Sequence, residues 1–338
     1  MIPNSAFITV GESERTLAEV AAGRAPSAEY AVLRQGHFSK VIAMVDSGVP
    51  AGSMSREARF AAAAYASSWS CENIYLGEEF PGIQYLALQA ALRRPKRIAM
   101  LVHNTASLRR RLPLASLRLG RFAQHYLCLS EHSKRELQHG YGIPASRITV
   151  VHSRVDTRFF TPDPSARIAT QVCSAGAVNR DYATLIEALR PLGVPLKIAA
   201  DTAWKHSTVE AEREPVPDFV EMRSWGTYEK LRGLYASSAV VVVPLQKPML
   251  SGITVALEAM AMGRPVILTH NAYIEDFVRD QENCLLVPAN DPEALRQKIR
   301  QLLDHPAQAE KLGARARDWV LERFTVDAYV RRLLSVWQ

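Results

Sequence analysis

SGITVALEAMAMGRPVI, residues 251–267, places a helix that is apolar on every side directly before a short strand. A helix without a polar stripe is buried within a protein. Gly263 and Pro265 end this helix, and the apolar run PVILT begins at once. A buried helix that leads into a buried strand is typical of a layered α/β domain.

The same alternation extends over the C-terminal half of the chain. Short apolar runs occur at TQVCSAG (170–176), VPLKIAA (194–200), AVVVVP (239–244), PVILT (265–269) and NCLLV (283–287). Helical patterns separate them at DYATLIEAL (181–189), YEKLRGLYASS (228–238), AYIEDFVRD (272–280) and PEALRQKIRQLL (292–303). Apolar runs of this length between amphipathic stretches predict parallel strands buried on both faces, and hence a doubly wound sheet.

The N-terminal half shows a less regular version of this pattern. We expect strands at EYAVL (29–33), KVIAMV (40–45), NIYL (73–76), RIAMLV (97–102), HYLCL (125–129) and RITVV (147–151). We expect helices at SERTLAEVAA (13–22), REARFAAAAYAS (56–67), GIQYLALQAALR (82–93) and SKRELQHGY (133–141). This order predicts a second Rossmann-like domain.

The segment 156–171 has two prolines and no clear period, so it is the predicted linker. A chain of 338 residues is long enough for two domains that each bury a core. We therefore predict an N-terminal domain over residues 1–158, a C-terminal domain over 159–324, and a last helix over 325–338.

Glu258 lies in the middle of the apolar helix, where a lone ionised carboxylate is costly. Thr254 precedes it by one turn on the same face. Ser251 and Gly252 stand at the helix N-terminus, where free amides and the helix dipole attract phosphate. A nucleotide with its phosphates at this N-terminus and its ribose on Glu258 satisfies these groups. The alternative is a buried ion pair, with Arg264 as the partner, and an ordinary serine N-cap.

Several segments resemble the retaining glycosyltransferases of family 4. PLQKPMLSGITVALEAMAMGRPVI (244–267) is similar to the donor-site signature of that family, and CSAGAVNRDYATLIEAL (173–189) resembles its strand, glycine loop and helix. YLCLSEHSKRELQHGYGIPASRITVVHSRVD (126–156) and NCLLVPANDPEALRQKIRQLL (283–303) extend the likeness over residues 97–338. The resemblance implies the GT-B fold, in which two Rossmann-like domains face each other across a donor cleft and the final helix returns to the N-terminal domain.

The resemblance also implies roles for individual residues. Arg180 would contact the donor diphosphate beside Gly176 of the glycine loop, and Lys247 would add a second positive charge. Glu258 would hold the ribose, and His103 would contact the donor sugar. The phosphate would bind the backbone at the start of the helix, which is formed by Ser251, Gly252, Ile253 and Thr254.

His103 ends a predicted strand, where open α/β sheets place their ligands. The alternative for it is a strand-end histidine bonded to the backbone. Glu78 and Glu79 also follow a strand and could hold an acceptor hydroxyl or act as a base, or could be solvated loop acids. The segment Arg223–Trp225 stands where the nucleobase often binds in the family, with a core role for Trp225 as the alternative.

The net charge of +7 favours anionic partners, and part of it is concentrated at 106–124, where five arginines alternate with leucines. A basic and apolar segment of this kind suits an anionic membrane surface. A surface helix with its leucines in the core, or an anionic acceptor, would explain the pattern equally well. No recognition motif for nucleic acid accompanies the charge.

Other classes of protein are disfavoured. The four cysteines are far apart, which indicates reduced core thiols rather than zinc ligands or disulfides. No window approaches eighteen apolar residues, and the first residues lack a secretory signal pattern. We expect a cytoplasmic protein, or one at the inner face of a membrane, that needs no metal or cofactor.

The predicted function is transfer of a sugar, with retention, from a nucleoside-diphosphate sugar to a hydroxyl of a glycan, glycolipid or small molecule. UDP or GDP is the expected nucleotide. Four features depart from the family. Leu250 replaces a glutamate that usually contacts the donor sugar, and Ala177 replaces an arginine of the diphosphate loop. Ser153 and Arg154 replace the usual Asn-Gly before Val-Asp, and the N-terminal glycine loop common in the family is not recognisable in residues 1–25. The alternatives are therefore a degenerate protein that binds nucleotide or a partner without turnover, or a sugar-nucleotide hydrolase or epimerase.

Overall fold

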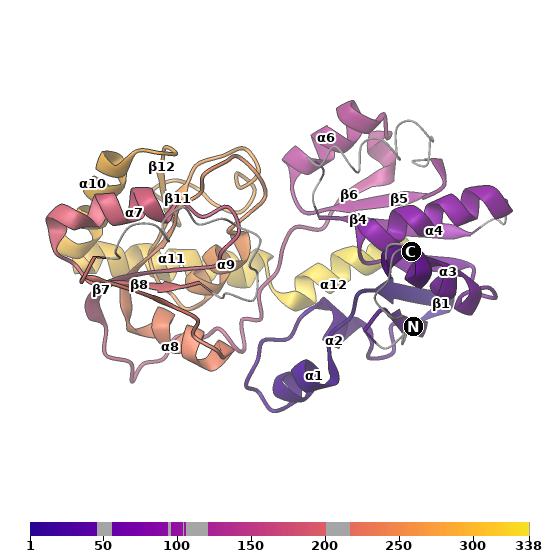
Figure 1. Cartoon of the computed structure of the whole chain (residues 1–338), viewed down its shortest axis with the longest axis horizontal. Helices are drawn as coiled ribbons and strands as arrows, with labels where there is room; N and C mark the ends of the chain where they lie inside the picture. Colours follow the sequence, from indigo (N-terminus) through magenta and orange to yellow (C-terminus); the bar gives the residue numbers. More distant parts are fainter. Residues whose placement is uncertain (46–55, 94–95, 104, 106–120, 201–216, 338) are drawn as a thin grey trace. The chain divides into compact units, whose positions relative to one another are not determined.

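The computed structural model describes residues 1–45, 56–93, 96–103, 105, 121–200 and 217–337. The chain forms two compact units (Figure 1). Unit 1 consists of residues 1–22, 27–152 and 327–338, and unit 2 consists of residues 23–26 and 153–326.

Unit 1 is built on a six-stranded parallel sheet with the strand order β2-β1-β3-β4-β5-β6. The strands are β1 (Ile2–Thr9), β2 (Phe38–Ala43), β3 (Asn73–Leu76), β4 (Arg97–Val102), β5 (His125–Cys128) and β6 (Ile148–Val150). Its helices are α1 (Glu14–Ala21), α2 (Glu29–Leu33), α3 (Arg56–Ser67), α4 (Glu79–Leu92), α6 (Glu131–Tyr141) and α12 (Val326–Leu334).

The two faces of this sheet bury different side chains. On one face Ile74 and Leu76 pack with residues of α3, α4 and α6. On the other face the rings of Phe7, Phe38 and Tyr75 are stacked. Successive residues of a strand point to opposite faces, which explains this division. Both faces are apolar, as expected for a parallel sheet covered by helices.

The helix α12 is tied to unit 1 by a buried carboxylate. Tyr329 of α12 and Tyr75 of β3 both donate hydrogen bonds to Glu29 of α2, over 2.8 and 2.5 Å. Two phenolic donors thus satisfy oxygens of the Glu29 carboxylate, which is buried.

Unit 2 contains a second six-stranded parallel sheet, in the order β12-β11-β10-β7-β8-β9. The strands are β7 (Ala169–Ala175), β8 (Leu196–Ala199), β9 (Val220–Arg223), β10 (Ser238–Val243), β11 (Val266–Thr269) and β12 (Leu285–Val287). Its helices are α7 (Tyr182–Leu189), α8 (Tyr228–Ser237), α9 (Ile253–Ala261), α10 (Pro292–Asp304) and α11 (Pro306–Arg323).

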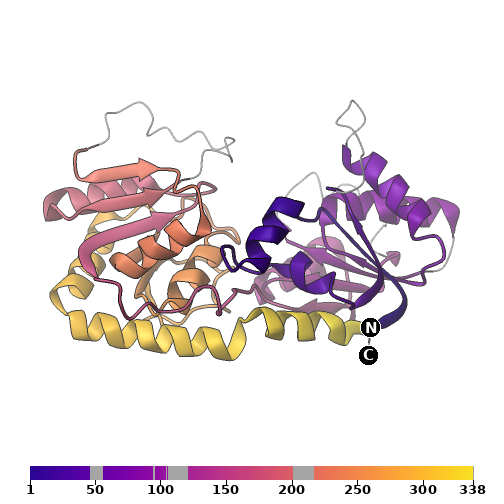
Figure 2. The ribbon, with the colours of Figure 1, turned by 90° about the horizontal axis from the view of Figure 1, so that it is seen from below.

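The helices of unit 2 cover both faces of its sheet. Residues of α8, α9 and α11 share one apolar core, and those of α7 and α10 share the core on the opposite face. The long helix α11 packs on α9 (Figures 1 and 2). Because α9 lies between β10 and α11, it is enclosed, and all its residues but Thr254 are buried. This confirms the prediction of a helix buried on all sides.

Most predicted elements are confirmed, and two are wrong. EYAVL (29–33) is helix α2 rather than a strand, and AYIEDFVRD (272–280) forms turns rather than a helix. Tyr273, Ile274, Phe277 and Val278 are buried, so burial rather than helix amphipathicity explains the apolar pattern of that segment. β1, β9 and α11 were not predicted. Among the described helices, none is long and apolar enough to cross a membrane.

Candidate active site

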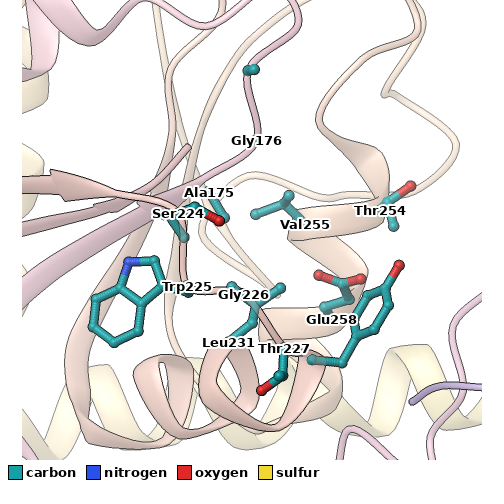
Figure 3. A pocket seen from close by; sticks show the side chains of 13 residues that line it. Ala175, Gly176, Ser224, Trp225, Gly226, Thr227, Leu231, Thr254, Val255 and Glu258 are labelled. Atoms are coloured by element: carbon teal, nitrogen blue, oxygen red, sulfur yellow. The ribbon is translucent and has the colours of Figure 1, made fainter. Parts of the chain in front are cut away.

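The strand order of unit 2 changes direction between β7 and β10. β8 and β9 follow β7 toward one edge of the sheet, and β11 and β12 follow β10 toward the other edge. Doubly wound sheets bind ligands at such a point, beyond the carboxyl ends of the strands. A cavity of about 400 Å³ is found there. It is lined by the last residues of β7 and β8, by residues that follow β7 and β9, and by the first turns of α8 and α9, with Trp225 and Glu258 on opposite sides in the view of Figure 3.

The glycine loop after β7 holds Arg180. Its Nε donates to the carbonyl of Ala175 over 2.9 Å and its Nη1 to the carbonyl of Val178 over 2.9 Å. A Cβ on Gly176, whose φ is +91°, would lie 2.7 Å from Nη2 of Arg180, so only glycine fits beneath the guanidinium. Burial lowers the pKa of Arg180, while Tyr182, Tyr235 and Glu258 act in the opposite direction.

The N-terminus of α9 lies beside this arginine. Its N-cap is Gly252, at φ +78° and without a side-chain cap, so the predicted alternative of an ordinary serine N-cap is wrong. Ser251 instead donates to the carbonyl of Val178 over 3.2 Å and accepts from Nη1 of Arg180 at 3.3 Å. The first amides of α9, beginning at Ile253, therefore remain free for an anion next to a guanidinium.

Glu258 lies on the wall of the cavity and is 6% exposed. Tyr235 of α8 donates a hydrogen bond to its Oε2 over 2.9 Å. Burial raises the pKa of Glu258 to about 7, although the Tyr235 hydrogen bond and the charge of Arg180 act in the opposite direction. Arg264 is not its partner: no ion pair joins them in the described residues, so the predicted alternative is wrong. Thr254 lines the cavity one turn before Glu258 (Figure 3).

Lys247 lies outside the cavity wall and is exposed. Its backbone is paired with Asn179 of the glycine loop: the Asn179 amide donates to the Lys247 carbonyl over 2.8 Å, and the Lys247 amide donates back over 3.1 Å. Asn179, at φ +59°, thus joins the loop after β7 to the loop after β10 at the switch point. Asn179 and Tyr235 were both missed from the sequence, because their roles depend on contacts between distant segments.

Ser224 and Trp225 line the cavity, together with Gly226, Thr227, Tyr228 and Leu231. Trp225 also packs against the core that α9 shares, as the alternative core role predicted, and a nucleobase contact at this segment stays a prediction. The guanidinium of Arg223 lies 4.2 Å from the Trp225 ring centre, a cation–π contact that holds the indole in place.

Unit 1 has a switch point of its own, between β1 and β3. Gly11 follows β1 at φ +80°, where a Cβ would lie 2.6 Å from the Cβ of Ala43, so this position requires glycine. The sequence showed no recognisable N-terminal glycine loop, because β1 itself was not predicted. Gly77 follows β3, and a Cβ there would lie 3.0 Å from the Phe7 ring.

The structure brings together Glu78, Glu79 and His103 at the carboxyl ends of β3 and β4. Nδ1 of His103 lies 3.2 Å from Oε2 of Glu79 and 3.6 Å from Oε2 of Glu78. Burial alone would lower the pKa of His103, but the Glu79 hydrogen bond and the charges of Glu78, Glu79 and Glu29 raise it. The ligand atoms of the three residues lie within 4.8 Å of one another, a spacing that could also hold a divalent cation. The absence of a metal requirement stays a prediction.

The basic segment 106–124 lies mostly outside the described residues. Of its arginines, only Arg121 is described; it is exposed and lies 5.1 Å from the ring centre of Phe122. The hypothesis of a membrane surface at this segment therefore stays a prediction.

Two family models match the chain. The model described as Glycosyltransferase Family 4 matches residues 29–159, and the model described as Glycosyl transferases group 1 matches residues 172–305. The first match falls mainly in unit 1, and the second lies within unit 2. The second region contains the unit 2 switch point, whereas the first contains β3 and β4 with Glu78, Glu79 and His103 but not β1.

Several curated proteins are similar in sequence. WcaL of Escherichia coli, which is provisionally named a colanic acid biosynthesis glycosyltransferase, is 30% identical over 213 residues, covering 58% of this chain and 52% of WcaL. A GDP-mannose-dependent alpha-(1-6)-phosphatidylinositol monomannoside mannosyltransferase of Mycobacterium tuberculosis is 24% identical, covering 78% and 74% of the two chains. The chain spans about half the length of WcaL and of a D-inositol 3-phosphate glycosyltransferase from Nocardiopsis dassonvillei.

Solved structures share the fold over the whole chain. Alr3699/HepE from Anabaena, in complex with UDP and glucose, superposes with a TM-score of 0.74 at 17% identity and 98% coverage of both chains. Sucrose-phosphate synthase from Thermosynechococcus elongatus gives 0.74 at 18% identity, again with 98% of both chains covered. At these identities the likeness shows the fold, and the predicted GT-B fold class, with two Rossmann-like units, is confirmed.

Proposed function

Because the chain belongs to the glycosyltransferases of family 4, we propose that it transfers a sugar, with retention, from a nucleoside-diphosphate sugar to an acceptor hydroxyl. The observation that carries this proposal is the arrangement of three groups around the first turns of α9. The buried carboxylate of Glu258 lines the unit 2 cavity together with Thr254, and the Arg180 guanidinium lies beside Ser251 at the open N-terminus of the same helix.

These groups match the parts of a donor nucleotide. The diphosphate lies against Arg180 and the first amides of α9, which supply positive charge without a metal ion. The ribose hydroxyls donate to Glu258, and this ligand accounts for a carboxylate kept at a cavity wall despite the cost of burial. UDP is the first nucleotide to test, because the structural neighbour HepE holds it.

The reaction requires departure of the nucleoside diphosphate and attack by the acceptor hydroxyl on the same face of the sugar. The bond between the anomeric carbon and the phosphate oxygen breaks, a bond to the acceptor oxygen forms, and the hydroxyl proton passes to the departing phosphate. Negative charge grows on the diphosphate, so Arg180 and the α9 amides stabilise the transition state more than the ground state. In this proposal His103 contacts the donor sugar, and Glu78 and Glu79 form the acceptor side.

The first experiment is a thermal-shift measurement with UDP, GDP, ADP, CMP and their common sugar conjugates. A ligand that binds only the native state raises the free energy of unfolding by an amount that grows with the logarithm of its concentration divided by Kd. We expect one diphosphate nucleotide to raise Tm selectively, and we expect Arg180→Ala and Glu258→Gln to lose that shift. No shift from any nucleotide, with a sound folded control, would contradict the donor assignment.

Leu250 and Ala177 favour a second candidate, a degenerate member that binds nucleotide without turnover. Leu250 packs against the apolar core that includes α9. A leucine at this position cannot offer the carboxylate that would contact a donor sugar. Transfer assays with the nucleotide chosen by thermal shift decide between the two functions. Tight binding without transfer or hydrolysis favours the degenerate protein, and rapid hydrolysis without acceptor favours a sugar-nucleotide hydrolase.

A further inference from the structure

Glu78, Glu79 and His103, at the carboxyl ends of β3 and β4, make unequal contacts with one another, and the proposed function does not explain this difference. Glu78 and Glu79 both approach the same ring nitrogen of His103, Nδ1. Across the described residues the other nitrogen, Nε2, makes no hydrogen bond, and the side chain is 34% exposed. One side of the imidazole is thus held by carboxylates, and the other is open.

The two carboxylates are not equivalent. The Glu79 side chain is 5% exposed and lies within hydrogen-bond distance of Nδ1, whereas the Glu78 side chain is 37% exposed and lies 0.4 Å farther away (3.6 against 3.2 Å). A buried carboxylate needs a counter-charge or donors more than an exposed one does. Glu79 is also the first residue of α4, where the positive end of the helix dipole favours its ionised form.

The backbone fixes this contact before any ligand binds. β3 and β4 are paired in parallel with Leu76 opposite Met100, so their carboxyl ends lie side by side. His103 follows β4 directly, and Glu79 begins the helix that follows β3. The backbones of Glu79 and His103 are thus held by the helix and the sheet at positions from which their side chains meet.

We propose that Glu79 is a positioning residue, which accepts the Nδ1 proton of His103, fixes the imidazole ring and leaves Nε2–H as the donor that meets the substrate. This inference rests on the proposed function and deepens it: Glu79 holds His103, and Glu78 is left as the carboxylate that faces the acceptor hydroxyl. A carboxylate on one nitrogen of a histidine sets the tautomer and the direction of the other nitrogen.

The charge distribution agrees with this geometry. The charged groups that act on His103 are Glu78, Glu79 and Glu29, all acidic, and together they overcome the effect of burial and raise its pKa. His103 therefore stays a cation to higher pH than an ordinary histidine. A charged N–H forms shorter and stronger hydrogen bonds than a neutral one, which suits contact with a donor molecule that carries a diphosphate.

Histidine NMR titration of the nucleotide-free chain tests the pairing without depending on activity. Nitrogen-15 correlation spectra resolve the protonation state and tautomer of each ring, and His103→Gln assigns the His103 signals by their loss. We expect a raised pKa and, in the neutral form, a proton on Nδ1. Glu79→Gln should lower the His103 pKa more than Glu78→Gln does, and the signals of His125, on β5, should not move.

Kinetics of the same variants test the positioning role. The cationic form of His103 is present below its pKa and is lost as pH rises through it, so the alkaline limb of kcat should move to lower pH in Glu79→Gln. If the His103 pKa falls by one unit, the cationic fraction on that limb, and kcat with it, falls about tenfold. The KM for the donor should change little, and Glu79→Asp, which keeps the charge, should restore the wild-type limb and provides the test if Glu79→Gln does not fold.

Two results overturn the inference: a His103 titration that Glu79→Gln does not move, or a kcat that falls equally at every pH. Failure of the proposed function looks different. If the unmodified chain transfers no sugar while Glu79→Gln still shifts the His103 titration, the transferase function is wrong and the Glu79–His103 pairing stands.

Discussion

The switch points of the two units have related topology and opposite chemistry. In unit 2 the helix after β10, α9, begins with Gly252, which offers no side-chain cap, and Arg180 lies beside it. In unit 1 the helix after β3, α4, begins with Glu78 as its N-cap and Glu79 as its first residue. One helix N-terminus is open to an external anion, and the other already carries its own carboxylates.

This difference shows how one sheet architecture can bind two kinds of ligand at the carboxyl ends of its strands. The sheet order places loops at a defined edge, but the residues in those loops decide which ligand is bound there. An open N-terminus with an arginine selects phosphate, whereas carboxylates accept protons from hydroxyl or imidazole groups. The net charge of +7 conceals this local contrast.

The largest effect expected concerns Arg180. Arg180→Lys keeps a positive charge but loses the fork that donates to Ala175, Val178 and Ser251 at once. We expect kcat/KM for the donor to fall about 100-fold or more, as for loss of a preorganised transition-state donor. Calorimetry with UDP and with uridine provides the control, because only the diphosphate should lose affinity. An equal loss of affinity for UDP and for uridine would mean that the substitution only distorts the glycine loop.

A second prediction converts the unit 2 N-terminus into one like that of unit 1. Ser251→Asp places a carboxylate beside Arg180 and the start of α9, where it competes with the diphosphate. We expect donor affinity to fall about tenfold or more, since the carboxylate takes the favourable charge of the helix end for itself. Ser251→Ala is the matched control and should cost about threefold or less, because it removes the two hydrogen bonds of the hydroxyl with Val178 and Arg180 but adds no charge. If the two variants bind nucleotide equally well, charge at this N-terminus does not select the ligand.

The third prediction concerns Glu258, a buried carboxylate of the unit 2 cavity wall. Its ionised form should bind ribose better, so donor affinity should rise as pH increases through about 7. Glu258→Gln should weaken binding about tenfold at pH 8, the effect of one hydrogen bond to a charged group, and should remove this pH dependence. Titration of UDP by calorimetry at pH 6 and pH 8 measures both effects. A dependence on pH that survives in Glu258→Gln must come from another group, such as the phosphate.

The same substitution should stabilise the protein. Because the folded pKa of Glu258 is about 7 and the ordinary value is 4.5, the folded state holds the proton more tightly than the unfolded state does. Stability is therefore lost as pH rises from about 4.5 to about 7, by about 3 kcal/mol in total. Relative to wild type, Glu258→Gln should raise the free energy of unfolding at pH 8 and much less at pH 5. Urea denaturation at the two pH values checks this, and equal differences would show that Glu258 is not buried as a costly charge.

The sequence located the elements of unit 2 better than those of unit 1, for a physical reason. Glu258 and Gly252 lie in or beside a helix whose apolar pattern is strong, so their positions on it followed from the sequence, whereas Arg180 was assigned from the family resemblance. Asn179 and Tyr235 act across 68 and 23 residues of chain, and no local pattern records such contacts.

In unit 1, local sequence patterns did not predict helix α2, strand β1 or the contact between Glu79 and His103. EYAVL, with its β-branched and aromatic residues, has the composition of a strand, but as α2 it buries Glu29 among tyrosines from β3 and α12. β1 carries polar residues at its start, so the strand and the glycine that follows it gave no clear signal. The proximity of Glu79 to His103 depends on the pairing of β3 with β4, which composition does not encode.

The smallest effect expected is that of Lys247→Ala on donor affinity. It tests whether the Lys247 ammonium group belongs to the anion site of unit 2 or only lies near it. Lys247 is exposed and held by its backbone rather than by its ammonium group, so Lys247→Ala should leave the glycine loop and the Asn179 contacts intact. An exposed charge is worth at most about 1 kcal/mol, so donor affinity should fall about fivefold or less at low salt, and the loss should vanish near 0.5 M salt because exposed charges are screened. UDP binding by wild type and variant at both salt concentrations measures this. A loss that persists in high salt would place the ammonium group against the diphosphate, and Lys247 would then join Arg180 as part of the anion site.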